Sequence, residues 1–327
     1  MNKNYNENCL DTMARMEDNF IDLTVTSPPY DDLRTYNGYS FDFESIAKEL
    51  YRVTKQGGVV VWIVGDATVK GSETGTSFKQ ALFFKECGFN LHDTMIYQKK
   101  GAGAVGSNKC YIQNFEFMFV FSKDKIKNTN LIYDRENKKV CTTITNGNRT
   151  IDNADTERKY RTITTKKLGR RFNIWEVEQR NNQDKYHKLH PAPFPEQLAN
   201  DHILSWSNEG DIVYDPFMGS GTTAKMAKIN NRNWIGSEIS EEYCYIANER
   251  IKETKPKWYW TMVEDKLIWN GVKERITTKM SNQDFKTMCR LHAKYFNHKY
   301  QEPCTCNKNR LRQWIQELSD KLIWKIQ

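Results

Sequence analysis

The fold of this 327-residue chain is decided by the stretch Asp215-Pro216-Phe217-Met218-Gly219-Ser220-Gly221-Thr222-Thr223. It follows residues 211–214, which we predict to form a strand, and it leads into residues 223–229, which we predict to form a helix. Gly219 and Gly221 allow a tight turn and a close approach of the backbone to a ligand. The free N–H groups at the helix N-terminus can bind a carboxylate. We therefore predict a ligand-binding turn, although a purely structural glycine turn would have the same spacing.

An acidic residue completes this predicted ligand site. Glu238 lies 23 residues after Asp215, at the end of the next predicted strand, residues 234–238. A doubly wound α/β fold places there an acid that binds ribose hydroxyls. The turn lacks the Gly-Lys-Ser/Thr of a phosphate-binding loop and the G-x-G-x-x-G of a dinucleotide site, and Asp215 would repel a pyrophosphate. These features indicate a cofactor that carries a cationic sulfonium and an amino group.

A second motif ends another predicted strand. Residues 20–26 are largely apolar and stop at Ser27-Pro28-Pro29-Tyr30, where the prolines lack the N–H groups that a sheet needs. A rigid backbone carbonyl and the Ser27 hydroxyl can accept hydrogen bonds from an NH₂ group and aim its lone pair at a methyl donor, without a covalent intermediate. Tyr30 offers a ring for stacking on an extrahelical base. An ordinary Pro-Pro turn is the alternative interpretation.

The remaining sequence alternates between strand and helix patterns. Gly57-Gly58 predicts a break in the chain before a buried strand. Apolar spacing predicts helices at residues 43–53, 78–87 and 194–206, and apolar runs predict strands at residues 59–64, 91–97 and 115–121. Strands separated by helices indicate an α/β sheet. Residues 122–172 interrupt this rhythm with polar and basic sequence, which predicts an inserted module.

The composition narrows the functional class. Hydrophobic residues make up 38% of the chain, which is enough for a core, and the sequence has no apolar run of about 18 residues that would predict a membrane span. The N-terminus lacks the apolar core of a secretion signal. We therefore expect a cytoplasmic protein without a membrane partner, whose eight cysteines are thiols.

Positive charge is concentrated in two segments. The net charge of the chain is +8, but residues 122–188 hold 17 Lys and Arg against 9 Asp and Glu, and residues 255–327 hold 15 against 7. The remainder of the chain is acidic. Clustered positive charge is the electrostatic footprint of a protein that binds a polyanion, although solvated surface would look the same.

Four motifs together resemble the amino DNA methyltransferases. Two are SPPY at residues 27–30 and DPFMGSGTT at residues 215–223. NFEFMFVFSK at residues 114–123 resembles the strand before the target-recognition region, and KLHPAPFPE at residues 188–196 resembles the segment that packs against the methionine part of the cofactor. With the catalytic motif first and the cofactor motif last, their order resembles the circularly permuted β class. The likeness spans about residues 5–254.

The resemblance implies a Rossmann-like S-adenosylmethionine-dependent methyltransferase sheet and four segments. Residues 1–121 become the catalytic half, residues 122–187 a basic target-recognition insert, residues 188–254 the cofactor-binding half and residues 255–327 a basic C-terminal extension. It also implies S-adenosyl-L-methionine as the cofactor and double-stranded DNA as the partner, with the methyl group going to a flipped base. A cognate restriction endonuclease as a further partner, and a monomer or a homodimer, are left open.

The same resemblance assigns the site residues. The clamp on the amino group and the stack on the base are assigned to Ser27, Pro28, Pro29 and Tyr30. The cofactor cradle is assigned to Asp215, Phe217, Gly219, Gly221, Thr222 and Glu238. Contacts with DNA are assigned to the basic insert, for which we select Lys166, Lys167, Arg170 and Arg171. Asn8 and Asp11 match a cofactor-contacting position only loosely.

The methylated base and the activity leave alternatives. Within the family SPPY favours cytosine N4 and DPPY favours adenine N6, so we predict cytosine N4, with adenine N6 as the alternative. A protein or RNA amino methyltransferase would use the same clamp, but the permuted order and the long basic insert argue for DNA. The alternative from another class is a catalytically inactive DNA-binding protein on the same fold. The intact Ser27, Tyr30, Asp215 and Glu238 argue against it.

The tail beyond residue 254 is not covered by the resemblance. Cys289, His292, Cys304 and Cys306 could form a zinc site, but Cys-x-Cys is less usual than Cys-x-x-Cys, so we predict thiols and no metal. Five tryptophans predict a small core or a packing surface; they are Trp258, Trp260, Trp269, Trp314 and Trp324.

Overall fold

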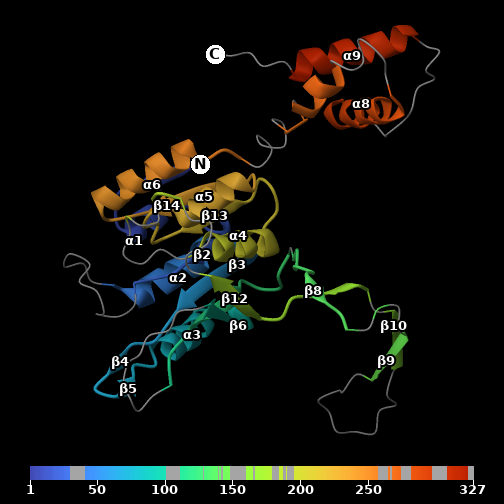
Figure 1. The fold of residues 1–327 in the computed structure, drawn as a ribbon. Helices are drawn as coiled ribbons and strands as arrows, with labels where there is room; N and C mark the ends of the chain where they lie inside the picture. Colours follow the sequence, from blue (N-terminus) through green and yellow to red (C-terminus); the bar gives the residue numbers. More distant parts are fainter. Residues whose placement is uncertain are drawn as a thin grey trace. The chain divides into compact units, whose positions relative to one another are not determined.

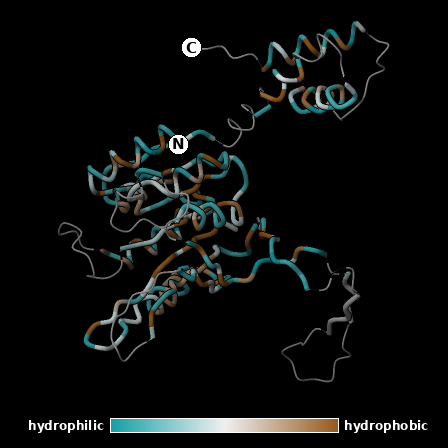
Figure 2. Tube along the Cα trace, viewed as in Figure 1, coloured by the Kyte–Doolittle hydropathy of each residue, from teal (hydrophilic) through white to brown (hydrophobic). Residues whose placement is uncertain are grey.

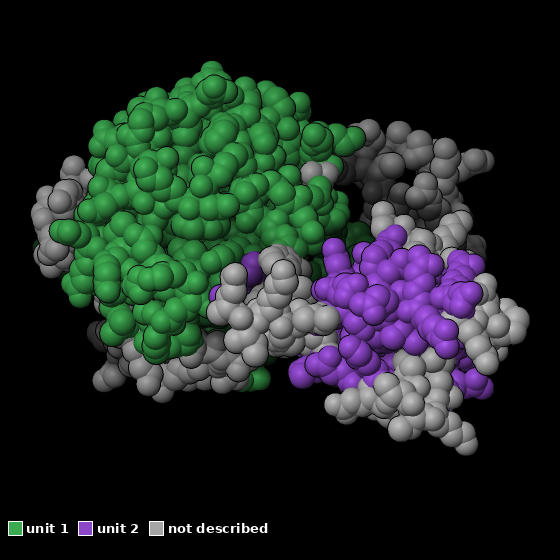
Figure 3. Space-filling view, turned by 90° about the horizontal axis from the view of Figure 1, so that it is seen from above, with its two compact units in different colours: residues 1–254 green, residues 255–327 purple. Residues whose placement is uncertain are grey.

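The structure, a computed structural model, divides the chain into two compact units, Met1–Thr254 and Lys255–Gln327 (Figure 3). It describes residues 1–29, 41–100, 111–127, 129–138, 140, 143–147, 160–164, 166–178, 184–186, 189, 195–256, 264–265, 267–273, 281–296 and 308–322. Each unit has a hydrophobic core of its own.

The first unit is built on a sheet whose eight described strands have the order β1-β14-β13-β2-β3-β7-β6-β12 (Figure 1). In that order the strands are β1 (Lys3–Tyr5), β14 (Asn233–Ser237), β13 (Ile212–Asp215), β2 (Ile21–Thr26), β3 (Thr54–Val64), β7 (Phe115–Ser122), β6 (Asn90–Lys100) and β12 (Ile174–Glu178). Neighbours are parallel, except that β7 runs antiparallel to both β3 and β6. This mixed, mostly parallel sheet with helices confirms the predicted α/β Rossmann-like fold.

The strand order reverses between β13 and β2. From β13 the chain continues through α5 (Thr222–Ile229) to β14 on one side, and from β2 it continues through α2 (Phe43–Val53) to β3 on the other side. β13 pairs directly with β2, with Val213 opposite Leu23 and Tyr214 opposite Thr24. In open α/β sheets, ligands bind outside the carboxyl ends of the strands at such a reversal.

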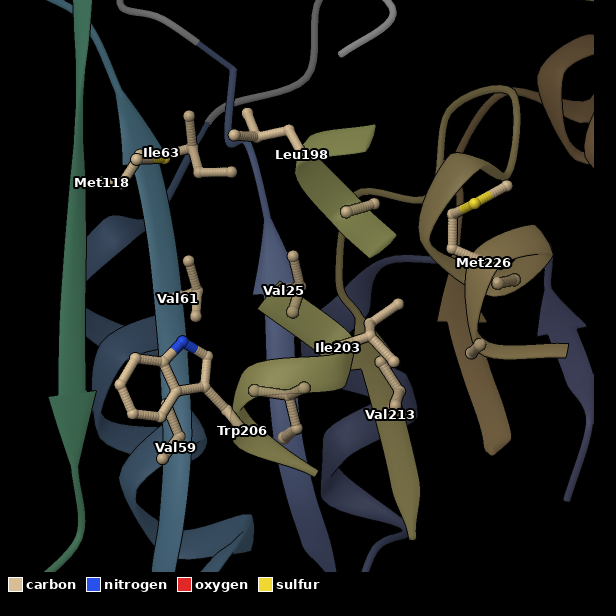
Figure 4. Packing of buried hydrophobic residues seen from close by; sticks show 14 of the residues in the cluster. Val25, Val59, Val61, Ile63, Met118, Leu198, Ile203, Trp206, Val213 and Met226 are labelled. Atoms are coloured by element: carbon tan, nitrogen blue, oxygen red, sulfur yellow. The ribbon is translucent and has the colours of Figure 1, made fainter. Parts of the chain in front are cut away.

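Helices cover both faces of this sheet. The remaining ones in the first unit are α1 (Cys9–Ala14), α3 (Thr76–Glu86), α4 (Glu196–Trp206) and α6 (Glu241–Glu253). On one face, α4, α5 and α6 pack on side chains such as Val25 and Val213 (Figure 4). On the other face, α1, α2 and α3 pack on side chains such as Val60 and Trp62. Because both faces are buried, the central strands β3 and β7 contain long apolar runs. Figure 2 shows brown, hydrophobic segments within this unit.

Helix α2 spans the residues that the apolar spacing predicts. Its N-cap residue Asp42 accepts a hydrogen bond from Ser45 N at 3.2 Å, which satisfies one of the free N–H groups of the first turn. Ile46, Leu50 and Val53 are buried against the sheet. Local capping and spacing are therefore sufficient to place this helix.

The predicted break at Gly57-Gly58 is wrong. β3 begins already at Thr54, and the glycines lie where the pairing of β3 with β2 shifts register between Ile21 and Leu23. Gly57 takes a φ of +78°, which a residue with a side chain rarely adopts. The two glycines therefore form an irregularity within the strand, as β-bulges do.

Short ladders occupy the polar stretch after β7. β8 (Arg135–Glu136) pairs with β11 (Leu168–Gly169), and β9 (Thr143–Gly147) pairs with β10 (Tyr160–Thr164), both antiparallel. β12 instead joins the main sheet beside β6. The end of this stretch is therefore part of the main sheet. A separate hairpin of β4 (Thr68–Val69) and β5 (Ser72–Glu73) follows β3.

The second unit contains α8 (Asn282–Tyr295), α9 (Lys308–Leu322) and helical residues 267–273. Its core includes Trp269 and Trp314, together with Phe285, Met288 and Leu318. These two tryptophans thus form part of a small core. Trp258, Trp260 and Trp324 lie outside the described residues.

Two of the four zinc candidates lie in this second unit's described part. Cys289 is buried in the core, and the His292 ring stacks on Trp314, with ring centroids 4.0 Å apart, and bonds to Glu317 Oε2 at 2.6 Å. Cys304 and Cys306 lie outside the described residues. Among the residues that the structure describes, no group of three or more His, Cys, Asp and Glu side chains could hold a metal ion. No described helix is long and apolar enough to cross a membrane.

Gly236 in β14 makes room for the turn that follows β13. It lies opposite Asp215 in the pairing of the two strands. A Cβ added to Gly236 would lie 1.6 Å from Met218 Cε and 3.0 Å from Met218 Sδ. Met218 N also donates a hydrogen bond to Ser237 O at 2.9 Å. A side chain at position 236 would therefore displace Met218.

We expect Gly236→Ala to lower the free energy of unfolding by about 1–3 kcal/mol, because overpacking a filled core costs this much. In a Met218→Ala background the same substitution should cost less, since the clashing atoms are gone. Chemical denaturation of the four proteins of this double-mutant cycle measures the difference. Equal costs in the two backgrounds would contradict the packing of Met218 on Gly236.

Candidate active site

The carboxyl ends of β2 and β13 are joined by a buried hydrogen bond. Thr26 Oγ1 donates to Asp215 Oδ1 at 2.7 Å, and Phe217 N donates to the same oxygen at 3.0 Å. Thr223 Oγ1, in the first turn of the following helix, donates to Val25 O at 3.2 Å. The predicted cofactor turn is therefore fastened at two points to the strand that leads into the predicted catalytic motif.

The glycine turn has the backbone that its sequence predicts. Gly219 and Gly221 take φ values of +50° and +80°, in the left-handed region that favours glycine. A Cβ on Gly221 would lie 3.0 Å from Ala247 Cβ on α6, so this glycine also permits close packing of the turn on that helix. Gly221 N donates to Met218 O at 2.8 Å, which closes the turn.

Glu238 lies beside this turn and is bonded to it. Its Oε2 accepts a hydrogen bond from Gly219 N at 2.7 Å, and its Oε1 accepts one from Ser240 N at 2.9 Å. The carboxylate thus links the turn to the N-terminus of α6. A polar residue that we did not predict supports the backbone here: Asn6 Nδ2 donates to Glu238 O at 2.9 Å and to Ile239 O at 3.1 Å.

The other predicted cofactor residues face in different directions. Thr222 begins α5 and is buried, and its hydroxyl accepts a hydrogen bond from Arg250 Nη1 at 3.0 Å. The Phe217 ring packs edge-on against Phe41 and Trp62, with centroids 5.6 Å and 6.1 Å away. Phe217 is thus part of an aromatic cluster on the face of the sheet that α2 covers.

The two acidic side chains of the site are shielded from water, since Asp215 is buried and Glu238 is half-buried. Burial raises the pKa of Asp215 to about 6, although hydrogen bonds from Thr26, Phe217 N and Thr223 oppose the rise. Burial also raises the pKa of Glu238, and the nearby Asp215 charge adds to that rise. Both carboxyl groups would therefore be stabilised in their charged form by a cation bound beside them.

The predicted catalytic motif, residues 27–30, directly follows the bonded end of β2. Ser27 and Pro29 are half-buried and Pro28 is buried, so the segment lies at the edge of the core next to Thr26. Tyr30 lies outside the described residues. The described part of this motif therefore follows β2, and the glycine turn follows the neighbouring strand β13.

The four basic residues selected in the insert differ in their surroundings. Lys166, Lys167 and Arg170 are exposed, while their backbone carbonyls accept hydrogen bonds from Asn137 and Arg135. Their side chains thus lie on an anchored segment and face solvent.

Arg171, the fourth, is half-buried and is bonded to two carboxylates. Its guanidinium bonds to Asp134 and, at 2.6 Å, to Asp201 Oδ2 on α4, and it lies over the Trp175 ring at 5.1 Å. The side chain therefore fastens the insert to α4. The sequence does not distinguish it from Arg170, because its carboxylate partners lie far away along the chain.

Asn8 and Asp11, which match a cofactor-contacting position only loosely, lie at the start of α1. Asn8 is the N-cap of α1, and its side chain accepts a hydrogen bond from Leu10 N at 2.9 Å. Asp11 is exposed in the first turn of that helix. A capping role accounts for Asn8 without a ligand.

Comparison with known proteins supports the predicted resemblance to the amino DNA methyltransferases. A family model described as DNA methylase, of the N6/N4 type, matches residues 21–249. The chain is 61% identical over 241 residues to the orphan methyltransferase M.BamHII of Bacillus amyloliquefaciens. The matched region covers 71% of this chain and 89% of that protein. It is 29% identical over 255 residues to the type II methyltransferase M.HpaI of Haemophilus parainfluenzae, covering 75% and 72% of the two chains.

Solved structures share the fold. The cytosine-N4-specific PvuII DNA methyltransferase matches with a TM-score of 0.57 and 21% identity over 76% of this chain and 85% of that one. A putative DNA modification methylase from Thermus thermophilus matches with a TM-score of 0.52 and 22% identity over 78% and 97%. The family model spans most of the chain, and the resemblance drawn from four motifs is confirmed. The chain belongs to the N6/N4 DNA methylase family, the amino DNA methyltransferases.

Proposed function

We propose that this protein transfers a methyl group from S-adenosyl-L-methionine to the exocyclic amino group of a flipped base in double-stranded DNA, with cytosine N4 as the target. The observation that carries the proposal is the hydrogen bond from Thr26 to Asp215. It joins the strand end that leads into Ser27-Pro28-Pro29 to the glycine turn. A methyl donor held at the turn and an amino group held at the motif would therefore be neighbours.

The residues of the turn fit this cofactor. Asp215, Phe217, Gly219, Gly221, Thr222 and Glu238 would hold it. The buried carboxyl group of Asp215 and the half-buried one of Glu238 both have raised pKa values, which favours a ligand with positive charge, as a sulfonium and an α-amino group provide. The backbone at Gly219 and Gly221 allows the ligand to approach closely. When bound, S-adenosyl-L-methionine supplies the electrophilic methyl group.

The catalytic motif would work by orientation. The Ser27 hydroxyl and a carbonyl of the Pro28-Pro29 segment can accept hydrogen bonds from the NH₂ group and hold its lone pair away from the ring. Such positioning acts mainly in the transition state and needs no covalent enzyme intermediate. Tyr30 is proposed to stack on the base, which must leave the duplex to reach a strand end.

The choice of base rests on the residue that begins the motif. Serine at position 27, in place of aspartate, favours cytosine N4 by its resemblance to that branch of the family. Adenine N6 is the alternative target with the same mechanism.

The DNA surface is proposed to lie on the insert, residues 122–187, between a catalytic half at residues 1–121 and a cofactor-binding half at residues 188–254. Lys166, Lys167 and Arg170 are exposed there and would contact phosphates. Arg171 would act indirectly, because its guanidinium is bonded to Asp134 and Asp201. Residues 255–327 would form a separate extension.

The chemistry can be tested at Ser27. We expect Ser27→Ala to lower turnover by roughly 10²–10³, because one aligned acceptor in the transition state is worth a few kcal/mol. Cofactor binding should survive, since the clamp lies outside the glycine turn. Ser72→Ala, in the exposed β4–β5 hairpin, is the matched control and should keep full turnover.

The product identifies the base. Mass spectrometry of digested DNA should show N4-methylcytosine after reaction with the wild-type protein. N6-methyladenine would reject cytosine but keep the mechanism. 5-Methylcytosine would reject the mechanism, because carbon methylation needs a nucleophile that adds to the ring.

The pKa of Asp215 predicts a pH dependence of cofactor binding. Below about pH 6 the carboxyl group is protonated in the free protein, so a cationic ligand must first displace a proton. Affinity for S-adenosyl-L-methionine should therefore rise with pH, by up to about tenfold per unit, and level off above about pH 6. Asp215→Asn should bind S-adenosyl-L-methionine weakly. Its affinity should also depend less steeply on pH, because only Glu238 would then titrate beside the ligand. Calorimetry between pH 5 and about 8 measures this, and a flat wild-type profile would count against the proposed cradle.

The DNA surface predicts a salt effect. Replacing Lys166, Lys167 and Arg170 with Gln should weaken DNA binding and reduce the slope of log affinity against log salt by about 0.9 for each lost phosphate contact. Cofactor affinity should not change. Lys252→Gln, on the exposed side of α6, is the control for loss of a surface charge. An unchanged slope in the triple variant would place the DNA surface elsewhere.

A further inference from the structure

A fully buried arginine lies beneath the glycine turn. Arg250, on α6, has no exposed side-chain surface. Its Nη1 donates to Ser220 O at 3.0 Å, to Ser220 Oγ at 3.2 Å and to Thr222 Oγ1 at 3.0 Å. The two N–H groups of this nitrogen are therefore shared among three acceptors of the turn, two on Ser220, between the two glycines, and one on Thr222, just after them.

The other nitrogens of the same guanidinium bind two carboxylates. Nε donates to Asp184 Oδ2 and Nη2 donates to Glu196 Oε1, both at 2.8 Å. Lys225 Nζ, on α5, reaches the same two oxygens at 2.8 Å and 2.5 Å. Two cations and two carboxylates thus form a balanced cluster, and the most exposed side chain among them, Asp184, is 26% exposed. Loss of one member would leave an uncompensated charge.

The four members come from parts of the chain with different proposed roles. Arg250 and Lys225 belong to the cofactor-binding half, and Glu196 begins α4. Asp184 lies at the carboxyl end of the insert, after β12 has joined the main sheet. Beside it, Lys185 Nζ bonds to Glu253 Oε1 at 2.9 Å, but that pair is largely exposed. The buried cluster is therefore the stronger attachment of the insert's end to the cofactor turn.

We infer that Arg250 is a positioning residue for the cofactor turn, and that Asp184 links the insert to this turn, so that DNA on the insert and cofactor on the turn strengthen each other's binding. This inference rests on the proposed function. The planar guanidinium suits the role because its nitrogens reach the turn, Asp184 and Glu196 in three fixed directions, which a lysine ammonium cannot reproduce. Coupling of this kind is reciprocal, so it can be measured from the cofactor side alone.

The linkage is tested by the affinity for S-adenosylhomocysteine, the cofactor product that lacks the transferable methyl group. Calorimetry is run without DNA and with unmethylated plasmid DNA that the wild-type protein methylates. For the wild type we expect DNA to tighten binding by about fivefold or more. In Asp184→Asn this ratio should fall toward one. Glu253→Gln breaks the neighbouring exposed pair with the same loss of one carboxylate, and it should keep the wild-type ratio.

The outcomes separate the inference from the proposed function. A ratio near one in the wild type, or equal ratios in Asp184→Asn and Glu253→Gln, overturns the linkage. If the wild type binds no S-adenosylhomocysteine and methylates no DNA, the proposed function itself fails.

The positioning role of Arg250 is tested separately. Arg250→Lys keeps the charge but loses the fork, and it should weaken binding of S-adenosylhomocysteine by about tenfold with and without DNA, which corresponds to the loss of roughly one charged hydrogen bond. Thermal unfolding of the variant, followed in parallel, shows whether it is folded at the assay temperature. A folded Arg250→Lys with wild-type affinity overturns the positioning role. If this variant does not fold, Ser220→Ala removes one acceptor of the guanidinium and should weaken binding in the same direction; unchanged affinity there overturns the role.

Discussion

The hydrogen bond between Thr26 and Asp215 joins the two strands at which the sheet reverses, and the geometry of the site depends on it. Both residues are buried, so water cannot take the place of either partner. Loss of the Thr26 hydroxyl would remove one of the donors that compensate the burial of this carboxyl group, next to the one from Phe217 N. The bond therefore holds the glycine turn at the end of the strand that leads into Ser27-Pro28-Pro29. Two motifs on rigid strand ends are positioned more accurately than two motifs on loops.

Strands that are adjacent in such a sheet need not be adjacent along the chain. Thr26 and Asp215 are 189 residues apart in sequence and adjacent in space, because a strand's place is set by the partners with which it pairs. The order has one consequence, however. Ser27-Pro28-Pro29 comes first in the chain and the glycine turn comes later, so residues 122–187 lie between them and are followed by α4. Asp184, near the end of this stretch, contacts Arg250 and Lys225 beside the turn.

Much of the fold could be predicted because its signals are local. The apolar spacing of residues 43–53 and the capping Asp42 predict α2. The glycine turn is predicted by the apolar run before it and the helix pattern after it. The remainder depends on partners that are distant along the chain. Arg170 and Arg171 look alike in sequence, and only the fold brings Asp134 and Asp201 to one of them. Arg250 gave no signal for the same reason.

A buried ion cluster is an unusual support for a turn, since apolar side chains of similar volume often stabilise a protein equally well. Here the backbone itself supplies a reason. Two left-handed glycines turn Ser220 O away from regular helix or strand partners, and a buried carbonyl needs a donor. Arg250 provides that donor, and Asp184 and Glu196 are then needed to balance its charge. The glycines allow the backbone to approach a ligand closely, and the guanidinium restricts the freedom that glycine would otherwise leave in the turn.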